Sequence, residues 1–189
     1  MRLVCVPCGE KAFVATLYTI GHSTRSLDEL VAALRAHSIA TLVDIRSFPV
    51  SRRLPHFNRE SLEKSLPQAG IRYIWMKGLG GMRKKIREDS PHVALRNEAF
   101  RNYADYMLTE DFQQGVAELG RLAEESRTAY MCAERAYFNC HRMLVSDWLV
   151  AHGHEVLHLD GTGPVKRHEL GTEARLVDGN LIYRGDRLL

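Results

Sequence analysis

TAYMCAERAYFNCHRMLVSDWLVAHG, at residues 128–153, is the stretch that decides the fold. Its apolar run at 129–131 predicts a buried strand that leads into Cys132, and a polar loop follows. We expect a helix to open at Asn139, which is a good N-cap, and to end at Gly153. A strand joined to a helix by a short loop is the repeating unit of parallel α/β folds.

Five reactive or charged side chains occupy the junction between this strand and this helix: Cys132, Glu134, Cys140, His141 and Arg142. The first turn of a helix carries free amides and a positive dipole, so Arg142 needs Glu134, a bound anion, or both beside it. The same field would lower the pKa of Cys140. The alternative is a structural ion pair between Glu134 and Arg142 above two unreactive cysteines.

Strand and helix patterns alternate along the rest of the chain. Strands are expected at 14–20, 41–45, 71–76 and 155–159, helices at 26–37, 59–69, 96–108 and 110–125, and a hairpin at 174–177 and 181–184. This order predicts an α/β fold with a mainly parallel sheet of about five strands, helices on both faces and a C-terminal β-hairpin. We treat 1–189 as one domain, with 1–13 as a poorly ordered N-terminal extension and 161–173 as surface loop.

Polar side chains follow the predicted strands at the points where they end. The carboxyl ends of parallel strands meet at one edge of the sheet, so we expect a single anion-binding cleft there. This cleft is also the candidate catalytic site. The candidate catalytic residues are Cys132, Glu134, Cys140, His141 and His22. The candidate ligand-binding residues are Ser23, Arg46, Ser51, Arg52, Arg142, Gly80 and Gly81, the two glycines forming either a phosphate-wrapping loop or a plain turn.

Several of these residues also have a purely structural explanation. His22 could be a turn residue, and Arg46 on a buried strand needs Asp44, another acid or a ligand as its partner. We expect Asp147 on a helix surface and His158 as a polar strand residue.

Composition is that of an ordinary globular protein, with 45% hydrophobic residues and a net charge of +3. No apolar run is long enough to span a membrane, and the N-terminus lacks a convincing signal peptide, so we expect cytoplasmic, reduced cysteines. Cys5 and Cys8 form a C-x-x-C pair, either half a zinc knuckle or a redox pair. The gap between Cys132 and Cys140 exceeds usual zinc-ligand spacing, so we predict no metal and no cofactor.

Positive charge is concentrated in one segment. Residues 46–87 contain eleven Lys or Arg and two Glu, a net charge of +9. Such a field favours an anionic small molecule, a nucleotide or a nucleic acid as the partner and gives no sign of a membrane. The alternative is a solvated face that keeps the protein soluble.

Spaced motifs resemble one known family. CAE at 132–134 and CHR at 140–142 resemble the signature of the family called Domain of Unknown Function 488. Its other marks follow in order: TIGHS at 19–23, VDIRSFPVSR at 43–52, LGG at 79–81, YADYM at 103–107 and VLHLD at 156–160. The resemblance runs from about residue 17 to the C-terminus and leaves CVPC at 5–8 outside. It implies no particular reaction, because that family has no settled activity.

Three functions fit these observations. The first is an enzyme for a phosphorylated or nucleotide-like substrate, with Cys132 or Cys140 as nucleophile; His22, His141 or Glu134 would transfer protons, and the arginines would bind the anion. Phosphatase and rhodanese loops offer an analogy, but their Cys-to-Arg spacing is tighter. The second is a non-catalytic nucleotide or nucleic-acid binding module that stacks bases on Tyr137 or Phe138. The third is a thiol redox or metal-binding protein.

Overall fold

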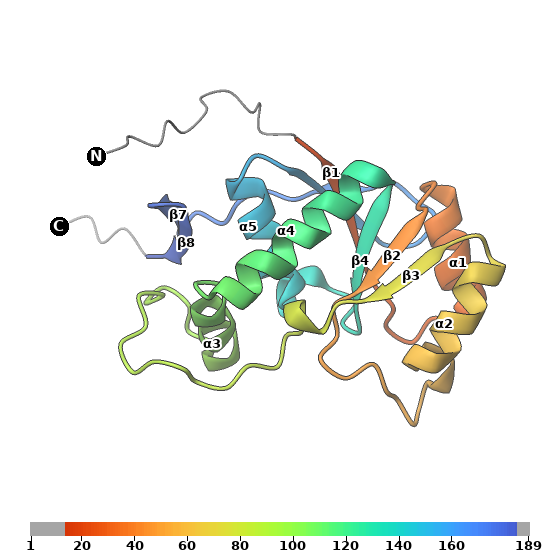
Figure 1. Ribbon diagram of the computed structural model, residues 1–189, viewed down its shortest axis with the longest axis horizontal. Helices are drawn as coiled ribbons and strands as arrows, with labels where there is room; N and C mark the ends of the chain where they lie inside the picture. Colours follow the sequence, from red (N-terminus) through yellow and green to blue (C-terminus); the bar gives the residue numbers. More distant parts are fainter. Residues whose placement is uncertain (1–13, 185–189) are drawn as a thin grey trace, which may run out of the picture.

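A sheet with five parallel strands forms the centre of the computed structural model, which describes residues 14–184 (Figure 1). The spatial order is β3 (Arg72–Trp75), β2 (Thr41–Asp44), β4 (Thr128–Cys132), β1 (Thr16–Gly21) and β5 (Glu155–Leu159). A short strand β6 (Lys166–Arg167) pairs antiparallel with β5 at the edge. The prediction of a mainly parallel sheet is therefore confirmed, with one strand more than expected.

Helices cover both faces of this sheet, as predicted. Helices α1 (Leu27–Ala36) and α2 (Arg59–Gln68) pack on one face, and α3 (Glu98–Tyr106), α4 (Glu110–Glu125) and α5 (Arg142–Ala151) pack on the other. Strand side chains alternate between the two faces and make a separate core with each group of helices. In β2, for example, Leu42 packs with the first group and Val43 with the second.

Short elements complete the described chain. Three 3-10 helices, η1 (Pro55–Phe57), η2 (Lys77–Leu79) and η3 (Tyr137–Asn139), lie in the loops after β2, β3 and β4. The predicted C-terminal hairpin is confirmed as β7 (Ala174–Val177) and β8 (Asn180–Tyr183). Asp178 and Gly179 both have positive φ, 49° and 77°, which is the geometry of the tight turn that closes a two-residue hairpin.

Two boundaries differ from the sequence analysis. Asn139 does not open α5: it ends η3, Cys140 is extended (φ −132°, ψ 150°), and His141 occupies the N-cap position. The helix predicted at 96–108 is shorter, because the Asn97 side chain accepts hydrogen bonds from the amides of Ala99 and Phe100 and so starts α3 at Glu98. Strand β6 lies within the stretch that we expected to be surface loop.

The topology opens the carboxyl edge of the sheet next to β4. Strands β1 and β2 flank β4 and lead to helices on one face, whereas β4 leads to α5 on the other. Loops that diverge in this way leave a crevice, which is where open α/β sheets bind ligands. Cys132, the last residue of β4, lies at this point. Within 14–184, no helix combines the length and the apolar character required to cross a bilayer.

Candidate functional site

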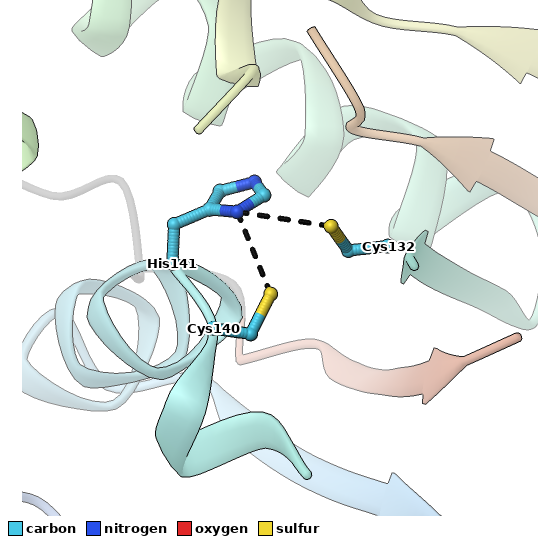
Figure 2. Close-up of side chains that lie close together, drawn as sticks. All are labelled: Cys132, Cys140 and His141. Atoms are coloured by element: carbon cyan, nitrogen blue, oxygen red, sulfur yellow. Dashed lines mark hydrogen bonds between the residues drawn. The ribbon is translucent and has the colours of Figure 1, made fainter. Parts of the chain in front are cut away.

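Two cysteines and a histidine meet at the end of β4. Cys132 ends the strand, while Cys140 and His141 lie between η3 and α5. Figure 2 shows one nitrogen of the His141 ring facing both sulfurs: Nδ1 lies 3.5 Å from Cys140 Sγ and 3.9 Å from Cys132 Sγ. The three atoms lie within 4.8 Å of one another, and all three residues are buried.

The other nitrogen fixes the orientation of the His141 ring. Nε2 lies 3.1 Å from the backbone oxygen of Ile45. A carbonyl oxygen only accepts hydrogen bonds, so Nε2 carries the hydrogen, and Nδ1 of the neutral ring presents its lone pair to the two sulfurs. Metal-bound histidines in proteins are commonly held by such a hydrogen bond from their second ring nitrogen.

Close packing holds the same ring from its sides. A Cβ on Gly81 would lie 2.4 Å from His141 Nδ1, and the Tyr103 ring centroid lies 5.1 Å from that of His141. A Cβ on Gly80 would lie 2.6 Å from Ser47 Oγ, the oxygen that accepts a hydrogen bond from the Met82 amide. The two glycines are therefore required for packing against the site, a role that neither sequence explanation, phosphate loop or plain turn, had described.

These separations fit a tetrahedral metal ion. With Zn–S near 2.3 Å and Zn–N near 2.0–2.1 Å, two ligands of a tetrahedral zinc should be about 3.6 Å apart from sulfur to nitrogen. The observed 3.5 and 3.9 Å lie close to that value. Among the described residues, this is the group of His, Cys, Asp and Glu side chains able to share an ion. The donor set would leave one coordination position for water or substrate.

The two thiols differ in acidity. The pKa of Cys140 is lowered because the Cys132 thiol donates a hydrogen bond to its sulfur, with a further contribution from the positive charge of Arg142. The pKa of Cys132 is raised by the same hydrogen bond and by burial. The environment thus favours a thiolate at Cys140, the form that binds metals and attacks electrophiles.

A cavity of about 510 Å³ lies beside the cluster. Its size suits a small organic ligand. Its lining is mixed, with aromatic and other apolar side chains beside a few polar ones: Arg46, Ser47, Phe48, Gly81, Met82, Ala99, Phe100, Cys132, Ala133, Glu134, Asn139, Cys140 and His141. Glu134, two residues beyond Cys132, is exposed, so its carboxylate is available to a ligand there.

Arg46 is held at the cavity by a buried network. Its Nε donates to Asp44 Oδ1 at 2.8 Å and its Nη2 to Asp44 Oδ2 at 2.5 Å, so Asp44 is the partner that the sequence left undecided. Nη2 also donates to the Phe57 carbonyl, and Tyr73 donates its hydroxyl hydrogen to Asp44. Arg46 is also a lining residue of the cavity, and Asp44 neutralises its charge.

His22 supports Arg46 and lies outside the cavity lining. Its Nδ1 donates to the Ser23 carbonyl at 2.9 Å, so its Nε2 accepts from Arg46 Nη1 at 3.2 Å, and its ring stacks on Phe57. Burial, and then the positive charge of Arg46, lower the pKa of His22 to about 4. A neutral ring with both nitrogens engaged is a positioning group here, which differs from the proton-transfer role suggested by the sequence.

Arg142 faces the interior. It is 1% exposed, and its guanidinium donates to Thr19 Oγ1 at 3.1 Å and to the carbonyls of Glu134 and Arg135 at 2.5 and 3.0 Å. The ion pair with the Glu134 carboxylate, one of the alternatives considered from the sequence, is absent from the described residues: the contact is to the Glu134 backbone. Arg142 therefore fixes the loop after β4 and has no place in the cavity lining.

Three other candidate residues lie away from the cluster. Ser23 has a positive φ of 51° and lines a separate surface hollow with Arg25 and Asp160. Ser51 accepts a hydrogen bond from the Leu54 amide within the loop after β2. Arg52 is exposed on that loop and does not line the cavity. Cys5 and Cys8 fall outside the described residues.

A second buried polar group escaped the sequence analysis. Asp147 was expected on a helix surface, yet it is 3% exposed and accepts hydrogen bonds from His168 Nε2, the Gly171 amide and the Tyr183 hydroxyl. His168 is linked in turn to His158 at 2.9 Å. The hydrogen-bond donors to Asp147 lie at 168–183, near the C-terminal end of the described chain. The sequence of α5 itself gives no sign that they will reach it.

Comparison with known families gives one match. The model of the family described as Domain of unknown function DUF488 matches residues 26–149. The matched range contains Arg46, Cys132, Cys140 and His141 and excludes His22 and β5. Comparisons with curated proteins and with solved structures gave no match.

Proposed function

The chain belongs to the DUF488 family, whose description carries no activity, and from the site we propose that it is a metal-dependent hydrolase. Cys132, Cys140 and His141 would hold a zinc-class ion, with the fourth position open to the cavity. Thiolate and imidazole donors favour zinc among the common divalent ions. This proposal departs from the expectation of no metal, which rested on ligand spacing along the sequence.

The proposal rests mainly on three possible metal-donor atoms that lie close together: the sulfurs of Cys132 and Cys140 and Nδ1 of His141. The lone pair of His141 Nδ1 points at two sulfurs, at separations suited to a tetrahedral ion, and Nε2 is tied to the Ile45 carbonyl. A catalytic zinc characteristically has three protein ligands and one open position, whereas structural sites have four protein ligands. Three donors beside a cavity support the catalytic kind.

The proposed mechanism assigns roles to two further residues. A bound zinc would lower the pKa of a water molecule to about 7 and polarise the substrate. Glu134 would accept the proton of that water as its oxygen attacks, and would return the proton to the leaving group as the scissile bond breaks. Arg46, which lines the cavity, would bind an anionic group of the substrate. A phosphorylated or nucleotide-like substrate suits this combination of one arginine and apolar walls.

The first test measures the metal. Elemental analysis of the purified protein should find a single zinc-class ion per chain, and X-ray absorption should give sulfur neighbours near 2.3 Å and nitrogen near 2.0–2.1 Å. Cys132→Ser with Cys140→Ser should abolish the bound metal. The matched control is Cys5→Ser with Cys8→Ser, which should leave it unchanged. Metal lost in the control and kept in the first variant would refute the assignment.

The second test measures turnover with a panel of phosphorylated and nucleotide substrates. Glu134→Gln should keep the metal and lower kcat by about 10²–10⁴-fold, as expected when a general acid–base group is removed. Arg46→Lys should raise KM more than it lowers kcat, because a flexible lysine ammonium is not fixed at the cavity by several hydrogen bonds as the planar guanidinium is. Turnover that survives complete removal of the metal by a chelator would overturn the proposal.

The thiol–imidazole contact supports a second candidate, a cysteine-dependent transferase or hydrolase. Cys140 Sγ lies 3.5 Å from His141 Nδ1, within reach for nucleophile and base. In that case Cys140→Ser would lose turnover while Cys132→Ser retains it, and a covalent intermediate would appear by mass spectrometry in metal-free protein. Equal loss in both variants supports the metal centre.

A further inference from the structure

We propose that the substrate-bearing partner is a single-stranded nucleic acid, bound across two adjacent hollows at the carboxyl edge with one base inside the cysteine–histidine cavity. This rests on the proposed function for the reaction, whereas strand binding is a separate and separately measurable property. Three features carry it: a second hollow, aromatic side chains positioned for stacking, and basic side chains without acidic partners.

A second hollow adjoins the first. It has a volume of about 340 Å³ and includes Asn58, Arg59, Trp75 and Lys77 in its lining. Ser47 and Phe48 line both hollows, so they form the boundary between them. Phe48 is 67% exposed, so its ring is accessible to a ligand at this boundary. Two hollows separated by an aromatic ring suit two successive bases.

Aromatic rings in this region are held in place. Trp75 donates its Nε1 hydrogen to the Arg46 carbonyl at 2.9 Å, and the Arg59 guanidinium carbon lies 4.5 Å from the Trp75 ring centroid. The Trp75 ring is thereby fixed at the wall of the second hollow, beside a cation. Bases stack on aromatic rings and on guanidinium planes without regard to sequence.

Positive side chains are exposed on the loops that follow β2 and β3, and one of them, Lys77, lines the second hollow. Both loops leave the same edge of the sheet and occupy the lower part of the view in Figure 1. Four exposed residues on them have no carboxylate within 4 Å anywhere in 14–184: Arg52, Arg53, Lys77 and Lys84. Unpaired cations on the loops that contribute to a cavity favour a ligand with several phosphates.

The same loops expose apolar side chains between the basic ones. Phe48, Val50, Met82 and Ile86 are 55–74% exposed. A face that served only for solubility would not need them. A nucleic-acid strand satisfies both kinds of side chain, since phosphates contact the cations and bases contact the apolar surfaces.

The test measures binding of fluorescent single-stranded DNA and RNA oligomers by anisotropy, over a range of salt concentrations, with the metal-loaded protein. Affinity should fall with salt, with a slope of about −0.7 per phosphate contact. Arg52→Glu with Lys77→Glu should weaken binding at least tenfold and reduce that slope. Lys64→Glu with Arg72→Glu, on α2 and at the opposite end of β3, is the control of equal charge and should retain the affinity.

Stacking is tested by Phe48→Ala, which should weaken oligomer binding about tenfold or more. Phe138→Ala, an equally large change at an exposed ring outside both hollows, should not. Equal loss in both charge variants, unchanged binding in Phe48→Ala, or competition by a mononucleotide as strong as by the oligomer would each overturn the inference. Loss of the metal leaves strand binding intact if the inference holds, which separates its failure from that of the proposed function.

Discussion

His141 connects three parts of the chain: it follows η3, its Nε2 reaches the Ile45 carbonyl beyond β2, and its ring packs against Gly81. The position of Nδ1 therefore depends on residues that never touch a metal. Small displacements at such supporting positions lower metal affinity even though every ligand is retained.

Gly81→Ala should accordingly weaken metal binding about 10–100-fold while the fold is retained. The added methyl group would lie 2.4 Å from His141 Nδ1, so the ring must move away from the two sulfurs. Competition with a chromophoric chelator measures the change. Gly163→Ala is the control, because a Cβ there meets nothing within 4 Å. Equal affinities for the two variants would show that Gly81 does not position the histidine.

The Asp44–Arg46 pair should contribute strongly to stability. Asp44→Asn leaves a buried guanidinium without its counter-charge, and breaking a buried pair in this way costs about 3–5 kcal/mol. Urea unfolding measures the loss. Glu63→Gln, which breaks the exposed Arg59–Glu63 pair, should cost less than about 1 kcal/mol. Similar losses of unfolding free energy for the two variants would mean that Asp44 is not needed to neutralise the buried charge of Arg46.

For single residues, the sequence predicts which side chains gather at the site better than it predicts the directions in which they point. The clustering of Cys132, Cys140 and His141 near one loop was readable from their order along the chain. The inward direction of Arg142 was not, because its acceptors are Thr19 and two backbone carbonyls that only the folded loop brings together.

Among the elements, α5 receives the C-terminal segment on its buried side. Asp147 accepts hydrogen bonds from His168, from Gly171 and from Tyr183 in β8, and all three donors follow β5 in the sequence. One carboxylate therefore fastens β6, the following loop and the hairpin to the helix that begins at the candidate site.

Asp147→Leu should loosen this segment more than any other. Three buried donors would lose their acceptor, and an unsatisfied buried polar group costs about 1–3 kcal/mol. Hydrogen exchange should accelerate in β8 while β2 and β4 remain protected. Tyr183→Phe removes one of the three hydrogen bonds and should produce a smaller change, about 1 kcal/mol. Uniform acceleration across the sheet would indicate global destabilisation and contradict a local fastening role.

Element boundaries follow local rules unevenly. The helix predicted at 26–37 begins where expected, because Ser26 and Glu29 form both hydrogen bonds of a capping box. The start of α5 was misplaced at Asn139, because η3 takes that residue and leaves Cys140 extended. A cap with partners three residues away is visible in sequence, whereas a loop shaped by Arg142 and the His141 packing depends on distant contacts.

For the molecule as a whole, the order of apolar strands and amphipathic helices was enough to predict a mainly parallel sheet covered on both faces. The strand order was not, because β4 inserts between β2 and β1 through contacts far apart in sequence. That insertion creates the opening into which the cysteines and His141 converge. The site could therefore be predicted as an edge of the sheet, but its donor geometry could not.

Whole-molecule stability should depend on pH through a histidine remote from the site. His92 is fully buried, accepts a hydrogen bond from the Tyr183 amide and faces Asp105, Arg87 and Arg184. Burial lowers the pKa of His92 to about 4, while Asp105 partly opposes the change. The folded-state pKa lies below the unfolded value near 6.5, so the unfolded chain takes up the proton first as pH falls. The stabilisation is complete above pH 6.5 and is lost between about 6.5 and 4.

His92→Asn should reduce this pH dependence, because an asparagine oxygen can still accept from the Tyr183 amide but does not titrate. Between pH 7 and pH 5, the wild-type protein should lose about 2 kcal/mol more unfolding free energy than the variant. Urea unfolding of each protein at the two pH values gives the difference directly, and any constant cost of the substitution cancels. Identical losses in the two proteins would show that His92 takes up its proton equally in the folded and unfolded states, which its burial beside two arginines argues against.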